Sequence, residues 1–325
     1  MFSMNHQKFI EMDELSAQKV PFFFMIDFLT ENVEIFKENE LEKSGLLIDF
    51  QHFSNSKKKE ELQKNIEWKS FPETLESFKS GFDEVQKNIR LGNSYLVNYT
   101  RKTKIETNLT LEEIFYHSCA KYKVFYKDFF VFFSPEIFVK IIDGKILTYP
   151  MKGTIDASLE NAAEILKNDK KEKAEHYTVV DLLRNDLSMV ADEVKVDKFQ
   201  HIDFIKTQQM DLYAMSSEIS GMLKPDYDGK VGSIMQKLLP AGSILGAPKP
   251  KTLEITLNAE GHERGYYTGV CGWFDGHNLD SCVMIRFIEK DGNELYFKSG
   301  GGITHMSKLE DEYQEMKNKI YVPIH

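Results

Sequence analysis

The chain has 325 residues, 42% of them hydrophobic and 12% aromatic, which is enough to bury a large core in one big domain or two modest ones. Its formal net charge of −10 argues against binding to nucleic-acid phosphates, because such sites need a basic surface. The apolar run at 20–27 is too short to span a bilayer, so we expect a soluble, cytoplasmic protein without membrane contact. The three cysteines have neither zinc nor CxxC spacing and are expected to be buried apolar side chains.

The predicted elements alternate between helices and groups of strands. Residues 1–70 mix strand-like apolar runs with a charged stretch, helical spacing covers 71–89, and a turn then leads into a strand at 95–100. The later predicted strands are 129–133, 137–142, 145–149, 266–274, 281–289 and 294–298, and the later helices are 159–187, 230–239 and 309–320. Strands in groups with helices between the groups indicate an α+β fold rather than a doubly wound parallel sheet.

Asp143 and Gly144 form a strong hairpin signal, because an Asp-Gly pair between two apolar strands favours a two-residue turn. Such a turn pairs the strands so that, at the open end of the hairpin, Glu136 lies across from Met151 and one step from Lys152. A carboxylate and an amine are therefore expected to meet there. An edge lysine in a salt bridge with a glutamate remains the alternative, and this geometry alone favours it.

Two pairs of glutamates lie three residues apart on predicted helices: Glu172 with Glu175, and Glu312 with Glu315. Like charges at this spacing share a helix face and cost a few tenths of a kcal/mol unless a cation neutralises them. Oxygen ligands from two helix faces suit Mg²⁺ rather than zinc. The alternative is two solvated helix faces, and it is supported by Lys319, which is placed to pair with Glu315.

Arg286 lies in a predicted strand that is apolar on both faces, so its guanidinium is expected to be buried and to need a carboxylate partner. The glycines that follow the next strand, Gly300, Gly301 and Gly302, allow backbone amides to approach a bound anion closely. A flexible turn is the alternative for these glycines, although a tight turn rarely needs three of them.

Nine segments, taken together, resemble the chorismate-binding family, which includes anthranilate, aminodeoxychorismate, isochorismate and salicylate synthases. The resemblance extends from about residue 70 to the C-terminus, and the segments occur in the same order as in that family. They are GNSYLVN (92–98), SPE (134–136), PMKGT (150–154), EHYTVVDLLRND (175–186), PAGSILGAPK (240–249), RGYYTG (264–269), IR (285–286), GGGI (300–303) and EYQEMKNK (312–319).

The resemblance implies a site for each end of chorismate. Mg²⁺ held by the four glutamates, with Glu175 and Glu315 closest, would bind the ring carboxylate. The residues implied to hold the enolpyruvyl carboxylate are Arg286, Tyr267 and the amides of Gly300, Gly301 and Gly302, with Lys319 as a second cation, while Thr154, Ser243 and Gly246 would line the pocket.

Position 152 separates the members of the family. Aminodeoxychorismate synthases carry lysine in this Pro-x-x-Gly-Thr motif, whereas anthranilate, isochorismate and salicylate synthases usually carry alanine. The resemblance therefore implies that Lys152 attacks chorismate, that Glu136 moves the proton, and that ammonia then gives 4-amino-4-deoxychorismate on the way to p-aminobenzoate. A separate glutamine amidotransferase subunit would supply the ammonia, forming a heterodimer.

Two departures from the family pattern qualify this reading. Ala214, in a segment read as helix, replaces a histidine that relatives carry near the departing hydroxyl, and residues 1–70 form a shortened N-terminal lobe, so tryptophan regulation is not expected. The fold implied is one large unit of two stacked, mostly antiparallel sheets flanked by helices, with 71–325 as the catalytic region. Anthranilate synthase and a non-catalytic chorismate-binding paralogue remain the alternatives.

Overall fold

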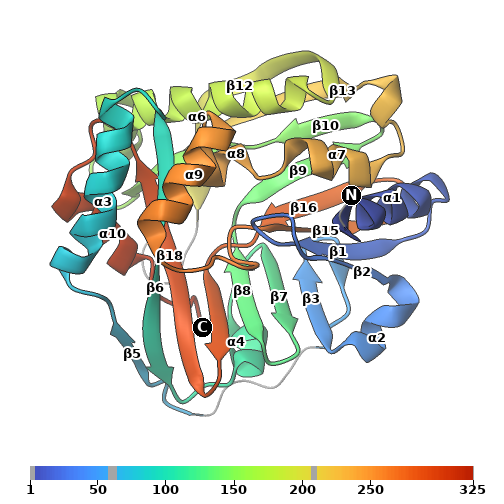
Figure 1. Ribbon diagram of the computed structural model, residues 1–325, viewed down its shortest axis with the longest axis horizontal. Helices are drawn as coiled ribbons and strands as arrows, with labels where there is room; N and C mark the ends of the chain where they lie inside the picture. Colours follow the sequence, from blue (N-terminus) through green and yellow to red (C-terminus); the bar gives the residue numbers. More distant parts are fainter. Residues whose placement is uncertain (1–3, 58–63, 206–210, 325) are drawn as a thin grey trace. The chain divides into compact units, whose positions relative to one another are not determined.

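The computed structural model describes residues 4–57, 64–205 and 211–324, and it contains two compact units (Figure 1). The first unit consists of Met1–Phe23, Glu136–Ser243 and Gly272–Ser281. The second unit consists of Phe24–Pro135, Ile244–Cys271 and Cys282–His325. Residue 70, which the sequence suggested as a boundary, falls inside the second unit, because the chain crosses between units several times.

The first unit is built on an antiparallel sheet in which β11, β13, β10 and β9 are successive neighbours and β12 pairs with β13. These strands are β9 (Ile137–Ile142), β10 (Lys145–Thr148), β11 (Met151–Asp156), β12 (Ala191–Ile205) and β13 (Leu212–Leu223). The helices are α1 (Met4–Ala17), α5 (Ala162–Asn168), α6 (Lys170–Ser188) and α7 (Val231–Leu238), with a 3-10 turn, η2, at Pro225–Tyr227. Helix α6 packs on β11, β12 and β13 (Figure 1).

The second unit contains an antiparallel sheet with the order β14-β6-β18-β17-β8-β7-β3-β4, with β5 beside β6. Its strands are β2 (Val33–Lys37), β3 (Leu46–Phe50), β4 (Phe53–Ser54), β5 (Trp68–Phe71), β6 (Leu96–Thr107), β7 (Tyr122–Tyr126), β8 (Phe130–Ser134), β14 (Gly246–Ala247), β17 (Phe287–Asp291) and β18 (Glu294–Ile303). Its helical segments are η1 (Glu38–Glu40), α2 (Leu41–Ser44), α3 (Leu75–Arg90), α4 (Leu111–His117), α9 (Lys249–Glu260) and α10 (Leu309–Asn318). Elements that contain a unit boundary are β1 (Phe22–Ile26), α8 (Gly242–Leu245), β15 (Val270–Phe274) and β16 (Leu279–Val283).

Helix α3 shows how local sequence and packing agree in the second unit. Thr74 caps its N-terminus by accepting a hydrogen bond from the Ser77 amide. Its buried residues recur at helical spacing, and Phe78 and Phe82 join the core cluster. A Cβ atom at Gly81 would lie 2.3 Å from the Tyr99 hydroxyl oxygen, so only glycine lets α3 approach β6 this closely.

The α+β prediction with mostly antiparallel sheets is confirmed, and so is the hairpin, in which Lys145 pairs with Ile142. The helix predicted at 159–187 is two helices, because the Asp169 side chain accepts a hydrogen bond from the Glu172 amide and starts α6 there. Residues 191–223 mostly form the long β12 and β13 strands. Ala214 therefore lies in β13, and its placement in a helix was wrong.

The structure also bears on the predictions about the cysteines and about membrane contact. Cys271 and Cys282 are buried as expected, but Cys119 is exposed, so the prediction of three buried cysteines was wrong for that residue. Within 4–57, 64–205 and 211–324, no helix is both long and apolar enough to cross a membrane.

Candidate active site

Lys152 lies at an irregularity in β11 that turns it toward helix α6. Lys152 pairs with Met215 and Thr154 pairs with Ala214, so the register shifts at Gly153, which has a φ of +74°. The Lys152 amine Nζ lies 3.3 Å from Glu175 Oε2 of α6. The amine is thus held against a carboxylate that the sequence assigned to a metal site.

Gly153 allows a second carboxylate of α6 to approach the same strand. A Cβ atom at this position would lie 2.7 Å from Glu172 Oε2 and 3.1 Å from Leu166 Cδ1. Glu172 and Glu175, three residues apart, therefore both reach the irregular part of β11 from one helix face. We call Lys152, Gly153, Glu172 and Glu175 the lysine–carboxylate cluster.

Glu136 is not placed beside Lys152 by the hairpin. Strand β10 ends at Thr148, and β11 pairs with β13 rather than continuing the β9–β10 ladder. Extending the hairpin register to residues 136 and 151 was therefore wrong. The Ser243 hydroxyl donates to Glu136 Oε1 across 3.0 Å, which brings together two predicted site residues. Only the backbone pairing of Thr154 is described, so its predicted place in the pocket stays a prediction.

His176 is a neighbour of the cluster that sequence reasoning did not single out. Its side chain is fully buried, and Nε2 lies 2.7 Å from the Ser217 hydroxyl oxygen. Burial, with smaller contributions from the nearby His201 and Lys152, lowers the pKa of His176 to about 4. The imidazole is consequently neutral near pH 7. A histidine directly after Glu175 was the available signal, but its burial depends on β13 packing against α6.

In the second unit, Glu312 and Glu315 of α10 lie above a glycine of β18. A Cβ atom at Gly301 would be 3.2 Å from Glu315 Oε1 and 3.4 Å from Glu312 Oε2. Lys319 donates to Glu315 Oε1 across 2.6 Å and to the Gly300 carbonyl across 2.7 Å. The predicted pairing of Glu315 with Lys319 is therefore confirmed.

The glycines at 300–302 lie in a strand rather than in a turn. Gly300 pairs with Thr100 and Gly302 with Asn98, whereas the register of β17 with β18 reaches only Lys298. A Cβ atom at Gly300 would lie 2.2 Å from the Tyr99 carbonyl oxygen. Close approach of the neighbouring strand explains Gly300, and close approach of α10 explains Gly301. Anion binding by their amides stays a prediction.

Arg286 lies in a break between two strands, so the prediction of one strand over 281–289 was wrong. Its φ of +55° is left-handed and cannot continue a β ladder, which is why β16 ends at Val283 and β17 begins at Phe287. The guanidinium carbon lies 5.5 Å from the centre of the Tyr321 ring. Among the residues that the structure describes, no carboxylate forms an ion pair with Arg286.

The remaining predicted pocket residues have clear packing roles. Tyr267 is buried, and its ring centre lies 6.0 Å from that of Phe287. Gly246 has a φ of +115°, and a Cβ atom there would lie 1.7 Å from the Leu96 carbonyl oxygen. Each observation explains the residue structurally, and contact of Tyr267 or Gly246 with a substrate stays a prediction.

Each unit, taken by itself, brings together two of the four predicted metal ligands. Glu172 and Glu175 meet at β11, and Glu312 and Glu315 meet above Gly301. Oxygen-only ligands of this kind match the preference of a hard divalent ion such as Mg²⁺. No group of three or more His, Cys, Asp or Glu that could hold a metal ion occurs within the described part of the chain.

Comparison with known proteins identifies the family. The model of chorismate binding enzymes matches residues 9–325. The chain belongs to this family. A Pasteurella multocida protein described as an uncharacterized PabA-like protein is 47% identical over 99% of this chain and 100% of its own length. The aminodeoxychorismate synthase component 1 of Bacillus subtilis is 36% identical over 58% of this chain and 40% of its own length.

A solved structure supports the same fold for this chorismate-binding enzyme family member. The menaquinone-specific isochorismate synthase of Escherichia coli superposes with a TM-score of 0.72 at 16% identity, covering 98% of this chain and 81% of the other. At this identity the likeness concerns the fold alone. It agrees with the mixed α+β architecture and its two antiparallel sheets.

Proposed function

We propose that the chain is the chorismate-aminating component of aminodeoxychorismate synthase, which converts chorismate and ammonia into 4-amino-4-deoxychorismate for p-aminobenzoate synthesis. The observation that carries the proposal is the position of Lys152, whose amine lies 3.3 Å from Glu175 Oε2 in a strand irregularity of a chorismate-binding fold. A lysine here supplies a nucleophile that the chemistry of amination at C4 can use.

The proposed reaction proceeds through Lys152. Its neutral amine attacks C2 of chorismate, the ring double bonds shift, and the C4 hydroxyl leaves as water after gaining a proton. Ammonia then attacks C4, the double bonds shift back, and the C2–N bond to Lys152 breaks. The sum is chorismate plus ammonia giving 4-amino-4-deoxychorismate plus water. In this proposal Lys152 is neutral before the attack, and Glu136 moves the protons.

Mg²⁺ fits the carboxylates that the two units supply, and we propose Glu172, Glu175, Glu312 and Glu315 as its holders. When bound, the ion would neutralise these side chains and attract the ring carboxylate of the substrate. Gly301 supports this assignment because it lets Glu312 and Glu315 approach a strand closely, and Gly153 does the same for Glu172. The proposal requires the two pairs to face one cation.

We propose that Arg286 holds the enolpyruvyl carboxylate of chorismate, with Lys319 adding a second positive charge. A guanidinium binds a carboxylate through two parallel hydrogen bonds, which fixes orientation as well as charge. Two observations support this role. Arg286 adopts an uncommon left-handed backbone conformation, and its guanidinium lies over the Tyr321 ring without an ion pair to a carboxylate of the described residues. Ammonia is proposed to come from a glutamine amidotransferase partner.

Product identification tests the proposal. The purified protein is incubated with chorismate, Mg²⁺ and ammonium, and the products are separated and identified by mass spectrometry. We expect 4-amino-4-deoxychorismate without release of pyruvate, and none from Lys152→Ala. Formation of 2-aminobenzoate with pyruvate would instead establish an anthranilate synthase. Binding of chorismate without any turnover would establish the non-catalytic alternative.

A further inference from the structure

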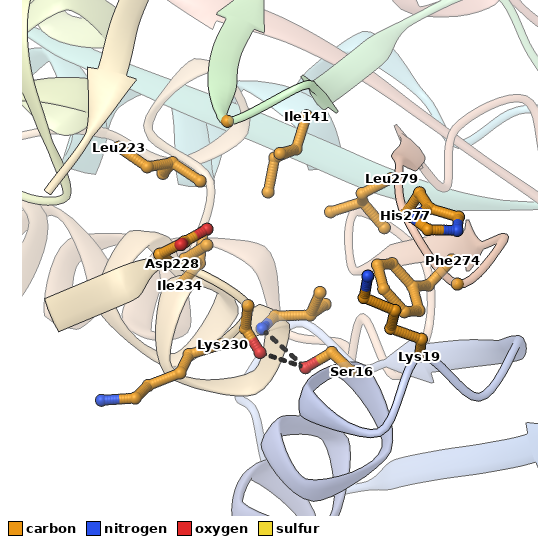
Figure 2. Close-up of a pocket in the computed structure, with 14 residues that line it drawn as sticks. Ser16, Lys19, Ile141, Leu223, Asp228, Lys230, Ile234, Phe274, His277 and Leu279 are labelled. Atoms are coloured by element: carbon orange, nitrogen blue, oxygen red, sulfur yellow. Dashed lines mark hydrogen bonds between the residues drawn. The ribbon is translucent and has the colours of Figure 1, made fainter. Parts of the chain in front are cut away.

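A cavity of about 150 Å³ lies in the first unit (Figure 2). None of the residues that line it belongs to the lysine–carboxylate cluster. Its walls come from the end of α1, the β9–β10 hairpin, the end of β13, the start of α7 and the turn between β15 and β16. The apolar part of the lining consists of Ile141, Leu223, Ile234, Phe274 and Leu279. Nothing in the proposed reaction uses this cavity.

Polar side chains stand on opposite sides of the cavity, and two of them, Asp228 and Lys19, carry opposite charges. Figure 2 shows the Asp228 carboxylate on one side and Lys19 and His277 on the other, with apolar side chains between them. Lys19 and His277 are held near each other, because a Cβ atom at Gly276 would lie 2.8 Å from the Lys19 carbonyl oxygen. Within the described residues, the side chains of Asp228, Lys19 and His277 form no hydrogen bond or ion pair.

The start of α7 does not itself offer an anion site. The Ser233 amide donates to Asp13 Oδ1 across 2.9 Å, and the Val231 amide reaches the Ser16 hydroxyl at 3.3 Å. Ser16 also donates to the Gly229 carbonyl across 2.7 Å, as the dashed lines in Figure 2 show. These bonds fix the wall beside Asp228 and leave the side-chain charges as the polar groups available to a ligand.

We propose that this cavity binds a small cyclic carboxylate that carries an amino group at the opposite end of its ring. The carboxylate would lie against Lys19 and His277, the amino group would donate to Asp228, and the ring would contact Ile141 and Leu279. A cavity of about 150 Å³ accommodates a benzene-sized body. Apolar walls with a few polar groups that fix orientation are typical of small-molecule sites. The inference does not depend on the reaction proposed above.

Binding of 4-aminobenzoate, the simplest probe that carries both groups across one ring, tests the proposal. Ligand-observed NMR titrations without chorismate compare it with benzoate, which lacks the amine, and aniline, which lacks the carboxylate. For a ligand of this size we expect a Kd of roughly 1 mM or tighter. We expect both comparison compounds to bind about tenfold more weakly, since each loses one charge-assisted hydrogen bond.

Variants assign the binding to this cavity. Lys19→Gln and Asp228→Asn should each weaken binding about tenfold. Two matched controls should leave it unchanged: Lys230→Gln, whose amine points away from the cavity in Figure 2, and Asp226→Asn. All four side chains are exposed, so the fold should survive, as circular dichroism can check. Absence of binding, equal binding of benzoate, or binding unaffected by Lys19→Gln and Asp228→Asn would overturn the proposal. Binding that only Arg286→Lys weakens would place the probe elsewhere and overturn it as well.

Discussion

At the scale of single residues, Lys152 is the group on which the proposed identity depends. Its amine is only partly exposed and is held by Glu175, an arrangement that a solvated edge lysine does not need. The alternative of a purely structural ion pair predicts the same short contact. The two readings differ in chemistry, because only a nucleophile forms a covalent bond to the substrate.

Lys152→Ala should abolish covalent capture of chorismate while the protein stays folded. Intact-mass spectrometry after exposure to chorismate and Mg²⁺ without ammonia should show an adduct on the wild type and none on the variant. Lys140→Ala is a matched control, because Lys140 also forms an ion pair, with Asp280 at 3.3 Å, and belongs to the same unit. An adduct that persists in Lys152→Ala would exclude this lysine as the nucleophile.

Substitutions of Arg286 should weaken substrate binding without lowering the stability of the fold. Arg286→Lys should lower kcat/KM by roughly 10- to 100-fold, mainly through a higher KM, because an ammonium cannot reproduce two parallel hydrogen bonds. Arg286→Gly should lose binding further but keep the Tm, since glycine relieves about 1 kcal/mol of left-handed strain at a φ of +55°. Steady-state kinetics and thermal unfolding measure the two effects.

Arg184→Lys serves as the matched control for Arg286→Lys. Arg184 forms an exposed ion pair with Asp181 and should tolerate the change with unaltered kinetics. Should Arg286→Gly unfold the protein while Arg286→Lys retains normal KM, Arg286 would be a structural residue.

At the scale of elements, the end of α9 is fixed by a buried ion pair. Arg264 and Glu260 are both 3% exposed, and Arg264 Nη2 lies 2.6 Å from Glu260 Oε1. The guanidinium also donates to the backbone carbonyls of Asn98 in β6 and of Ile244 in α8. Glu260 in turn accepts from the Thr100 amide across 2.7 Å. The network thus joins α9 to β6, the strand that neighbours the glycine-rich part of β18.

Arg264→Met should cost about 3 to 5 kcal/mol in the free energy of unfolding, because it leaves the Glu260 carboxylate buried without its main partner. Urea denaturation provides the measurement. Arg184→Met removes an exposed pair and should cost at most about 1 kcal/mol. A similarly small loss for Arg264→Met would show that Glu260 finds another partner or is neutral.

At the scale of the whole molecule, the proposed cation site needs carboxylates from both units. Mg²⁺ at about 100 times its Kd should stabilise the fold by roughly 2.7 kcal/mol. Glu175→Gln and Glu315→Gln should each remove most of this stabilisation, and the double variant should lose no more. Thermal unfolding with and without Mg²⁺ gives the result independently of activity.

Without Mg²⁺, these variants should be nearly as stable as the wild type, because loss of one carboxylate relieves like-charge repulsion on its helix. Glu164→Gln, an exposed position on α5, should keep the full response to Mg²⁺. A full response in both Glu175→Gln and Glu315→Gln would contradict a shared metal site.

Buried histidines should make the fold sensitive to mild acid. Burial lowers the pKa of His176 to about 4 and also lowers the pKa of His262, so the unfolded chain binds more protons than the folded one below about pH 6.5. Stability should therefore fall as the pH decreases from about 6.5 toward 4, by roughly 2 to 3 kcal/mol for His176 alone.

Denaturation at several pH values between 7 and 5 tests this, because that window lies above the ordinary titration of carboxylates. His176→Gln keeps a group that can hydrogen-bond to Ser217 and should flatten the dependence. An equally steep loss of stability in His176→Gln would assign the effect to other groups.

The sequence by itself determined the features that depend on neighbouring residues. The Asp143-Gly144 turn fixed the pairing of Ile142 with Lys145, and the three-residue spacing placed Glu172 with Glu175 on one helix face. Helical periodicity over 71–89 likewise predicted α3. The family resemblance also rests on short motifs of neighbouring residues, so the sequence is sufficient to reveal it.

Only the tertiary structure decided which strands pair and where they break. β11 pairs with β13 rather than extending the hairpin, and the Lys152 amine lies 3.3 Å from Glu175 of α6. The strand break at Arg286 and the strand made by Gly300, Gly301 and Gly302 also depend on distant backbone. The physical reason is that strand pairing is set by contacts between residues far apart in the chain, whereas turns and helices are set by residues within a few positions of one another.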